Sequence, residues 1–142
     1  MKPAILAASV ALLAAVAQVA SAEPGGSMPA PIVFLDIAGP DMAQQAAFYR
    51  AVFDWDIRKD GGFSAPVTAP LAATLRQDPR DKIIYVGVDD VTATLAKIKA
   101  NGGAIIQPRL EVKGVVVLGL FTDPAGNSMG LVELKDGKPK VP

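Results

Sequence analysis

The hydrophobic stretch VVVLGLFTDPAGNSMGLVEL, residues 115–134, contains the strongest structural signal in the chain. Two apolar runs flank residues 123–127, in which proline sets one turn position and glycine gives the backbone the freedom to reverse. This pattern predicts a β-hairpin. Both faces of its strands are hydrophobic, so we expect one face to pack under helices and the other to line an enclosed space.

The residues before the hairpin predict a strand, a helix and a further strand. Residues 83–88 (IIYVGV) are rich in β-branched and aromatic side chains, which favour strands. An aspartate at 89 or 90 can cap a helix, which Asn-Gly-Gly at 101–103 ends. Residues 104–110 then predict one more strand.

The first half of the chain follows the same order. Residues 32–38 (IVFLDIA) predict a strand, and Asp41 is a natural N-cap for a helix that extends to about Phe53. Prolines weaken the strand signals that follow, because proline removes a hydrogen-bond donor from a sheet, and they leave the register between 57 and 82 open. Residues 55–58 predict a short strand, and the candidates weakened by Pro66 and Pro70 are residues 63–67 and 71–76.

The two halves are versions of one unit. IVFLDI at 32 and IIYVGV at 83 are 51 residues apart, and each is followed by an acidic N-cap, a helix and three strand candidates. This β-α-β-β-β pattern defines module one at about 32–78 and module two at about 82–134. Two such sheets can shelter their inner faces from water by curling around a shared cleft, so we expect an α+β domain.

Residues 1–22 have the pattern of a secretory signal peptide. Lys2 gives a positive start, residues 4–17 form an apolar run, and Ala20-Ser21-Ala22 is a small-x-small cleavage site. The alternative is an uncleaved membrane anchor, which needs about 20 apolar residues, and Gln18 interrupts this run. We therefore expect export to the periplasm or the medium.

The remaining 120 residues (142 minus 22) are enough for one domain, at 32–142, after a Pro/Gly-rich flexible leader at 23–31. There is no cysteine, which excludes a disulfide framework. Basic and acidic residues number 14 each, without a basic stripe. Nucleic acid and anionic membrane surfaces are therefore poor candidates as partners.

Three stretches in the right order carry a family resemblance. AFYRAVFDW at 47–55 is similar to an FY-x-x-x-FGW helix end, with Asp54 in place of glycine, and the others are VDDVTATLAKIKANGG at 88–103 and FTDPAGNSMGLVE at 121–133. With these stretches the chain resembles the vicinal oxygen chelate superfamily, the glyoxalase, bleomycin-resistance and extradiol-dioxygenase group. The resemblance implies paired βαβββ modules that form a half-open eight-stranded barrel around a small-molecule site, often in a homodimer.

The same resemblance speaks against the metal chemistry of the family. Metal-dependent members hold a divalent cation with side chains at positions that match Phe34, Ile83 and Gly130 here, and none of these side chains can donate a lone pair. The chain has no histidine and no cysteine, so only carboxylates, amides and hydroxyls remain, which suit a hard cation at best. We expect no metal and no cofactor, and we expect these three positions to face the cleft.

Five residues are candidates for ligand binding. By alternation Asp36 shares the face of Phe34, where it could act as a general base or bind a cationic ligand; the alternative is a solvated strand end. By alternation Tyr85 shares the inner face of its strand with Ile83, where it could stack on a ligand and donate a hydrogen bond, or be a core tyrosine. Phe34 and Ile83, with Gly130, indicate either an apolar ligand pocket or a cleft filled by its own side chains.

Four other residues have a more ordinary interpretation. Trp55 is expected in the core at the end of a helix rather than in the cleft wall. Glu133 stands an odd number of residues after Gly130, so it should face the other way as a surface or strand-end charge. Arg109 and Glu111 either rim the opening or form a solvated salt bridge.

Three functional hypotheses follow. The first is an exported, metal-independent small-molecule-binding protein that holds an apolar or aromatic ligand, with Asp36 and Tyr85 as polar contacts. The second is an enzyme, a lyase, isomerase or dioxygenase-like member, that uses a divalent cation held by carboxylates and substrate oxygens, with Asp36 as the candidate catalytic residue. The third is a structural module whose cavity is packed shut.

Overall fold

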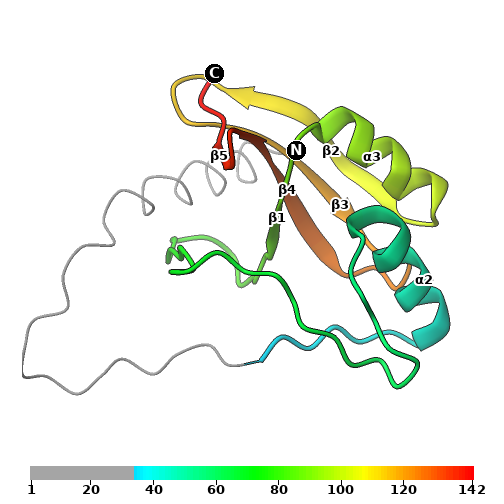
Figure 1. Ribbon diagram of the computed structural model, residues 1–142. Coiled ribbons are helices and arrows are strands. Elements are labelled where there is room, and N and C mark those ends of the chain that lie inside the picture. Colours follow the sequence, from blue (N-terminus) through cyan, green and yellow to red (C-terminus); the bar gives the residue numbers. More distant parts are fainter. Residues whose placement is uncertain (1–33) are drawn as a thin grey trace, which may run out of the picture.

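The computed structural model describes residues 34–142 and has an α+β fold with a mixed sheet (Figure 1). Its elements are α2 (Met42–Phe53), β1 (Tyr85–Val88), α3 (Val91–Ala100), β2 (Ala104–Val112), β3 (Val116–Thr122), β4 (Ser128–Lys135) and β5 (Lys138–Pro139). The strand order is β1-β4-β3-β2, and β5 also pairs with β4. β1 runs parallel to β4, whereas the other pairs are antiparallel. The predicted fold class is confirmed.

The predicted hairpin is the centre of this sheet. β3 and β4 pair antiparallel from Leu118–Val132 to Thr122–Ser128. In the turn between them, Gly126 has a φ of 93°, a left-handed conformation that glycine adopts without strain. The glycine of the turn therefore has the effect that the sequence predicted.

Both helices begin at a predicted aspartate. The side chains of Asp41 and Asp90 each accept a hydrogen bond from the backbone N–H three residues further on. α2 ends at Asp54, which has a φ of 56° and stands where the family motif has glycine. Aspartate tolerates this left-handed conformation better than most residues, so the helix ends in the same way without the glycine.

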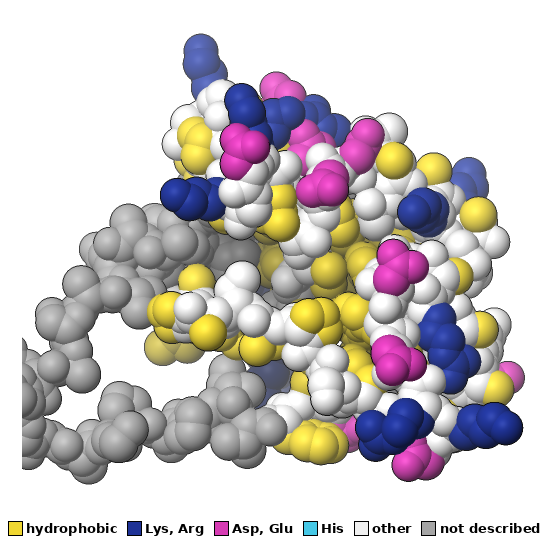
Figure 2. All heavy atoms as spheres, viewed as in Figure 1, with side chains coloured by type: hydrophobic (Ala, Val, Ile, Leu, Met, Phe, Trp, Pro, Cys, Tyr) yellow, Lys and Arg dark blue, Asp and Glu magenta, His cyan; other side chains and the backbone are white. Residues whose placement is uncertain are grey.

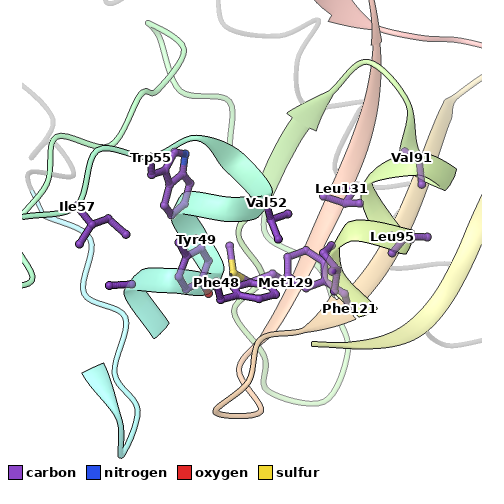
Figure 3. Packing of buried hydrophobic residues seen from close by; sticks show 12 residues of the cluster. Phe48, Tyr49, Val52, Trp55, Ile57, Val91, Leu95, Phe121, Met129 and Leu131 are labelled. Carbon is purple, nitrogen blue, oxygen red and sulfur yellow. Dashed lines mark hydrogen bonds between the residues drawn. The ribbon is translucent and has the colours of Figure 1, made fainter. Parts of the chain in front are cut away.

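The helices α2 and α3 lie on the same side of the sheet and cover one of its faces (Figure 1). Phe48, Phe121 and Met129 meet between α2 and the hairpin (Figure 3). The ring of Trp55 is buried and stacks on Tyr49 at a centroid distance of 5.2 Å. The core position predicted for Trp55 is confirmed.

The opposite face of the sheet is also apolar. Val116, Leu118 and Val132 are buried there, and Tyr85 packs against them. The neighbouring residues of β1, Val86 and Val88, pack instead against the helix-covered core. Alternation along β1 therefore places Tyr85 away from the helices, as the sequence predicted.

The second sheet expected from module one is not formed in the part of the chain that the structure describes. Residues 34–41 and 54–84 contain no helix and no strand, so α2 is the only element of module one that has the predicted conformation among the described residues. Pro66 and Pro70 cannot donate to a sheet, and Leu75 is 100% exposed, so little burial offsets the entropy of ordering this segment. Module two forms the sheet, and the half-open barrel remains a prediction.

No helix among residues 34–142 is long and apolar enough to cross a membrane. The predicted signal peptide and leader lie outside the described residues, as do Ile32 and Val33 of the first strand candidate. On the face drawn in Figure 2, basic and acidic side chains are interspersed. This face has no extended patch of one charge, in agreement with the balanced composition.

Candidate functional site

Two of the predicted ligand-binding residues meet on the sheet face away from the helices. Tyr85 and Gly130 are register partners in the parallel pair of β1 and β4. A Cβ atom at position 130 would stand 2.4 Å from both Cδ1 and Cε1 of Tyr85. The tyrosine ring therefore occupies the space that a side chain at 130 would need.

Ile83 lies outside β1, with Ile84 between it and the start of the strand, and it is half-buried. It stands two residues before Tyr85, and alternation would place it on the same face of the chain. Leu134 of β4 packs against the same apolar cluster as Tyr85. The surroundings of Tyr85 are therefore aliphatic, as expected for either an apolar ligand site or a packed face.

Phe34 and Asp36 are placed differently from the expectation. Phe34 is 82% exposed and Asp36 is exposed too, so neither lines an enclosed space with Gly130. Residues 34–38 are not paired as a strand, so no ladder holds their inner side against the sheet. Ile37, on the other side of this segment, packs against the helix-covered core. Ligand binding by Phe34 and Asp36 stays a prediction.

The positions that match the metal ligands of the family do not fit a cation. The side chains of Phe34 and Ile83 carry no lone pairs, and the Tyr85 ring fills the side-chain space at Gly130. Among residues 34–142 there is no group of three or more His, Cys, Asp or Glu side chains that could hold a metal ion. The side chains at these three positions therefore offer a cation neither an oxygen nor a nitrogen donor.

A buried carboxylate in the hairpin turn joins α2 to the sheet. Asp123 is 2% exposed, and its Oδ2 accepts hydrogen bonds from Gln45 Nε2 (2.8 Å), Tyr49 Oη (2.8 Å) and Asn127 Nδ2 (2.7 Å). Its Oδ1 accepts from the backbone N–H groups of Ala125 (3.0 Å) and Asn127 (2.9 Å). The turn pattern did not indicate this role for Asp123, although Gln45 and Tyr49 are polar residues of α2 that need a hydrogen-bond partner when they are buried.

The network fixes the protonation states of its members. Burial acts to raise the pKa of Asp123, but the hydrogen bonds from Asn127, Gln45 and Tyr49 outweigh it and hold the pKa below its usual value. Burial, together with the hydrogen bond to Asp123, raises the pKa of Tyr49. Asp123 is therefore an ionised acceptor and Tyr49 a neutral donor at pH 7, an arrangement that stabilises the junction of α2 and the hairpin.

A second buried carboxylate corrects the prediction for Glu133. Its Oε2 accepts from Arg109 Nε (2.9 Å) and the backbone N–H of Val91 (3.2 Å), while Oε1 accepts from Arg109 Nη2 (2.9 Å) and Lys140 Nζ (2.8 Å). The odd step from Gly130 does turn it toward the helices, but α3 covers that face and leaves Glu133 only 5% exposed. The prediction of a surface charge was wrong because the cover comes from a distant element.

The partners of Glu133 explain its ionisation. The hydrogen bonds from Arg109 hold the pKa of Glu133 well below its usual range, against the effect of burial. Arg109 also pairs with Glu111 through Nη1 at 2.8 Å, which confirms the predicted salt bridge. The cluster joins the start of α3, the sheet and the C-terminal segment, so we expect it to stabilise the fold.

A hollow of about 150 Å³ is lined by residues between 74 and 81, at the boundary of the two modules. Arg76 lies beside it, between Asp78 at 3.5 Å and Asp81 at 3.4 Å. None of the five candidate ligand-binding residues lines this hollow. It therefore adds nothing to the site at Tyr85 and Gly130.

The two buried carboxylates predict a loss of stability in acid. Their ordinary pKa values are 3.8 for Asp123 and 4.5 for Glu133, and the fold lowers both. The unfolded chain then binds protons more readily than the native one, so the stabilisation is present above these values and is lost as the pH falls through and below them. Urea denaturation at pH 7, 5, 4 and 3 should show little change between pH 7 and 5 and a steep fall below pH 4.5. An equal free energy of unfolding at pH 7 and 3 would contradict this.

Comparisons with known proteins agree with the fold. The model of the Glyoxalase/Bleomycin resistance protein/Dioxygenase superfamily matches residues 31–131. The anthracycline biosynthesis protein DnrV of Streptomyces peucetius is 25% identical over 118 residues, covering 66% of this chain and 43% of that protein. The putative glyoxylase CFP32 of Mycobacterium tuberculosis is 25% identical over 113 residues, covering 69% and 43%. The chain thus spans less than half the length of these curated relatives.

Solved structures show the same architecture at low sequence identity. The hypothetical protein SA1046 from S. aureus is 19% identical, with a TM-score of 0.56 over 77% of this chain and 96% of that one. A glyoxalase-related enzyme from Fulvimarina pelagi is 16% identical, with a TM-score of 0.56 over 73% and 88%. Likeness at this level of identity concerns the fold alone.

Proposed function

Because the chain belongs to the glyoxalase/bleomycin resistance protein/dioxygenase superfamily, we propose that it is an exported protein that binds an apolar or aromatic small molecule without a metal ion. The observation that carries this proposal is the sheet face of Tyr85 and Gly130. This face is apolar, while α2 and α3 both cover the opposite one. Export is proposed on the pattern of residues 1–22.

The chemistry of the face favours a ligand with a large apolar part. Tyr85 lies among aliphatic side chains and supplies one hydroxyl, which can donate a single hydrogen bond. Asp36 is the second polar contact that we propose, and residues 34–38 would have to approach the sheet for its carboxylate to reach the ligand. One curated relative is named an anthracycline biosynthesis protein, and anthracyclines contain fused aromatic rings. That name supports the aromatic ligand class.

Metal analysis of the purified protein tests the metal-free part of the proposal. We expect no stoichiometric metal and no change in melting temperature with Mg²⁺, Mn²⁺, Ca²⁺ or Zn²⁺. A stoichiometric cation, or a cation that raises the melting temperature, would favour the enzyme alternative with carboxylate ligands instead.

A ligand series tests the binding part. A neutral ring compound present at 100 times its Kd adds about 2.7 kcal/mol to stability, which should raise the melting temperature by roughly 5 °C or more. The panel should contain neutral aromatic and saturated ring compounds, with a hydrophilic polyol as the control. If no member of the panel raises the melting temperature, the binding proposal fails and the packed structural module is the better interpretation.

A further inference from the structure

The single tryptophan of the chain is stacked on one of its two tyrosines (Figure 3). The rings of Trp55 and Tyr49 lie nearly parallel, with an interplanar angle of 7° and a centroid distance of 5.2 Å. Both side chains are buried. Because the two π systems are in contact, an electron can pass from one ring to the other without crossing solvent or backbone.

Tyr49 also has a partner that can take its proton. Its Oη stands 2.8 Å from Oδ2 of Asp123 and 3.0 Å from the sulfur of Met129. A hydroxyl has one hydrogen, and an ionised carboxylate is a stronger acceptor than a thioether, so the phenol donates to Asp123. The phenol proton therefore has an acceptor at the end of an existing hydrogen bond.

The other rings beside this pair are phenylalanines. Phe63 stacks on Trp55 at a centroid distance of 5.2 Å, and Phe53 stacks on Tyr49 at 6.1 Å. A benzene ring gives up an electron far less readily than an indole or a phenol, so the oxidised state does not rest on either phenylalanine. The second tyrosine, Tyr85, packs in a different cluster on the opposite face of the sheet.

Trp55 is the end of the pair that lies closer to solvent. Its two neighbours in the sequence, Asp54 and Asp56, are both exposed, whereas the hydroxyl of Tyr49 is enclosed between α2 and the hairpin. An oxidant in solution therefore approaches the indole more closely than the phenol. The charges of the two aspartates favour a neutral oxidant over an anionic one.

We infer that Trp55, Tyr49 and Asp123 form an oxidation relay that protects the tryptophan from small one-electron oxidising radicals. The radical takes one electron from the Trp55 indole and is reduced, and the indole becomes a radical cation. Tyr49 then returns one electron to the indole, and in the same step its phenol proton moves to Asp123 Oδ2. The products are an intact indole, a neutral tyrosyl radical and a neutral carboxylic acid, so atoms and charge balance. The relay is independent of the proposed ligand.

Pulse radiolysis of the purified protein in azide solution tests the relay. The azidyl radical is neutral and takes single electrons from indoles. The tryptophanyl absorption should decay while the tyrosyl absorption rises, at a first-order rate that does not change with protein concentration. A tryptophanyl radical that does not convert, or one that converts at a rate proportional to protein concentration, would overturn the inference.

Two variants identify the tyrosine that is oxidised. Tyr49→Phe keeps a ring in the stack but has no hydroxyl, so the first-order conversion should be lost. Tyr85→Phe should retain the conversion, because Tyr85 lies on the other face of the sheet. Mass spectrometry after the pulse should find more oxidised Trp55 in Tyr49→Phe than in the wild type. Conversion that persists in Tyr49→Phe, or equal oxidation of Trp55 in both proteins, would contradict the relay.

A third variant tests the proton acceptor. Asp123→Asn keeps the shape of the side chain, but a neutral amide does not take up a proton at pH 7. The first-order rate should therefore fall on the order of 100-fold, the lower end of what a positioned proton acceptor contributes. If Asp123→Asn does not fold, the wild-type rate in D2O decides the question, because a proton that moves with the electron makes the transfer slower there. An unchanged rate in folded Asp123→Asn, or equal wild-type rates in H2O and D2O, would refute the role of Asp123.

Discussion

Replacing Asp123 with alanine is expected to lower the free energy of unfolding by about 3–5 kcal/mol, the largest effect of a single polar substitution that we predict. The substitution removes the acceptor of Gln45 Nε2 and Tyr49 Oη, both of which come from buried side chains of α2. A buried donor without an acceptor keeps its desolvation cost and gains nothing in return. The turn also loses the acceptor of two backbone N–H groups.

Urea denaturation of the wild-type and variant proteins measures this loss. Asp123→Asn keeps one oxygen acceptor and should cost less than Asp123→Ala. Asp56→Ala is the control, because Asp56 is exposed and a change there should stay within about 0.5 kcal/mol. If Asp123→Ala were as stable as the Asp56→Ala control, the network would not hold α2 to the hairpin.

Replacing Glu133 with alanine is expected to lower the free energy of unfolding by about 2–4 kcal/mol. Glu133 is the shared acceptor of Arg109, Lys140 and the first backbone N–H of α3. Its removal leaves two cations beside each other without their common carboxylate, and one helical N–H loses its acceptor. The loss should be smaller than at Asp123, because the side chains of Arg109 and Lys140 are 27% and 38% exposed and can turn toward water.

Chemical denaturation of a small set of variants separates the contributions. Lys140→Ala removes only the more exposed pair and should cost about 1 kcal/mol or less. Replacing both Glu133 and Arg109 with apolar residues of similar volume should recover part of the loss, because the cost comes from leaving one charge buried without its partner. A Glu133→Ala variant with wild-type stability would contradict a structural role for the cluster.

The sequence predicted module two well because its signals are local. Aspartate N-caps, the glycine turn and β-branched runs act within a few residues, and α3, β2, β3 and β4 formed at the expected places. The two-residue strand β5 was missed, since it is a strand only by its pairing with Leu134 and Lys135 of β4. In module one, α2 has the same local signals and formed as well, while the strand candidates at 55–58, 63–67 and 71–76 found no partner strand.

The candidate site was predictable only in part. Alternation along residues 83–88 was enough to place Tyr85 on the face away from the helices, and the register of β1 against β4 then brought it onto Gly130. The exposed positions of Phe34 and Asp36 could not be predicted, because alternation gives a face only when the strand is paired. The buried hydrogen-bond networks of Asp123 and Glu133 were not predicted, since most of their partners lie far away in the sequence.

The sequence by itself determined the α+β class, the family, the helix ends, the central hairpin and the lack of histidine and cysteine ligands. Each of these depends on residue type or on neighbours a few positions away. Only the tertiary structure decided that Asp123 meets Gln45 and Tyr49, that Glu133 is buried, and that the ring of Tyr85 occupies the side-chain space at Gly130. The physical reason is that burial and hydrogen-bond partners come from whichever distant segment packs against a residue, and a linear pattern does not specify that segment.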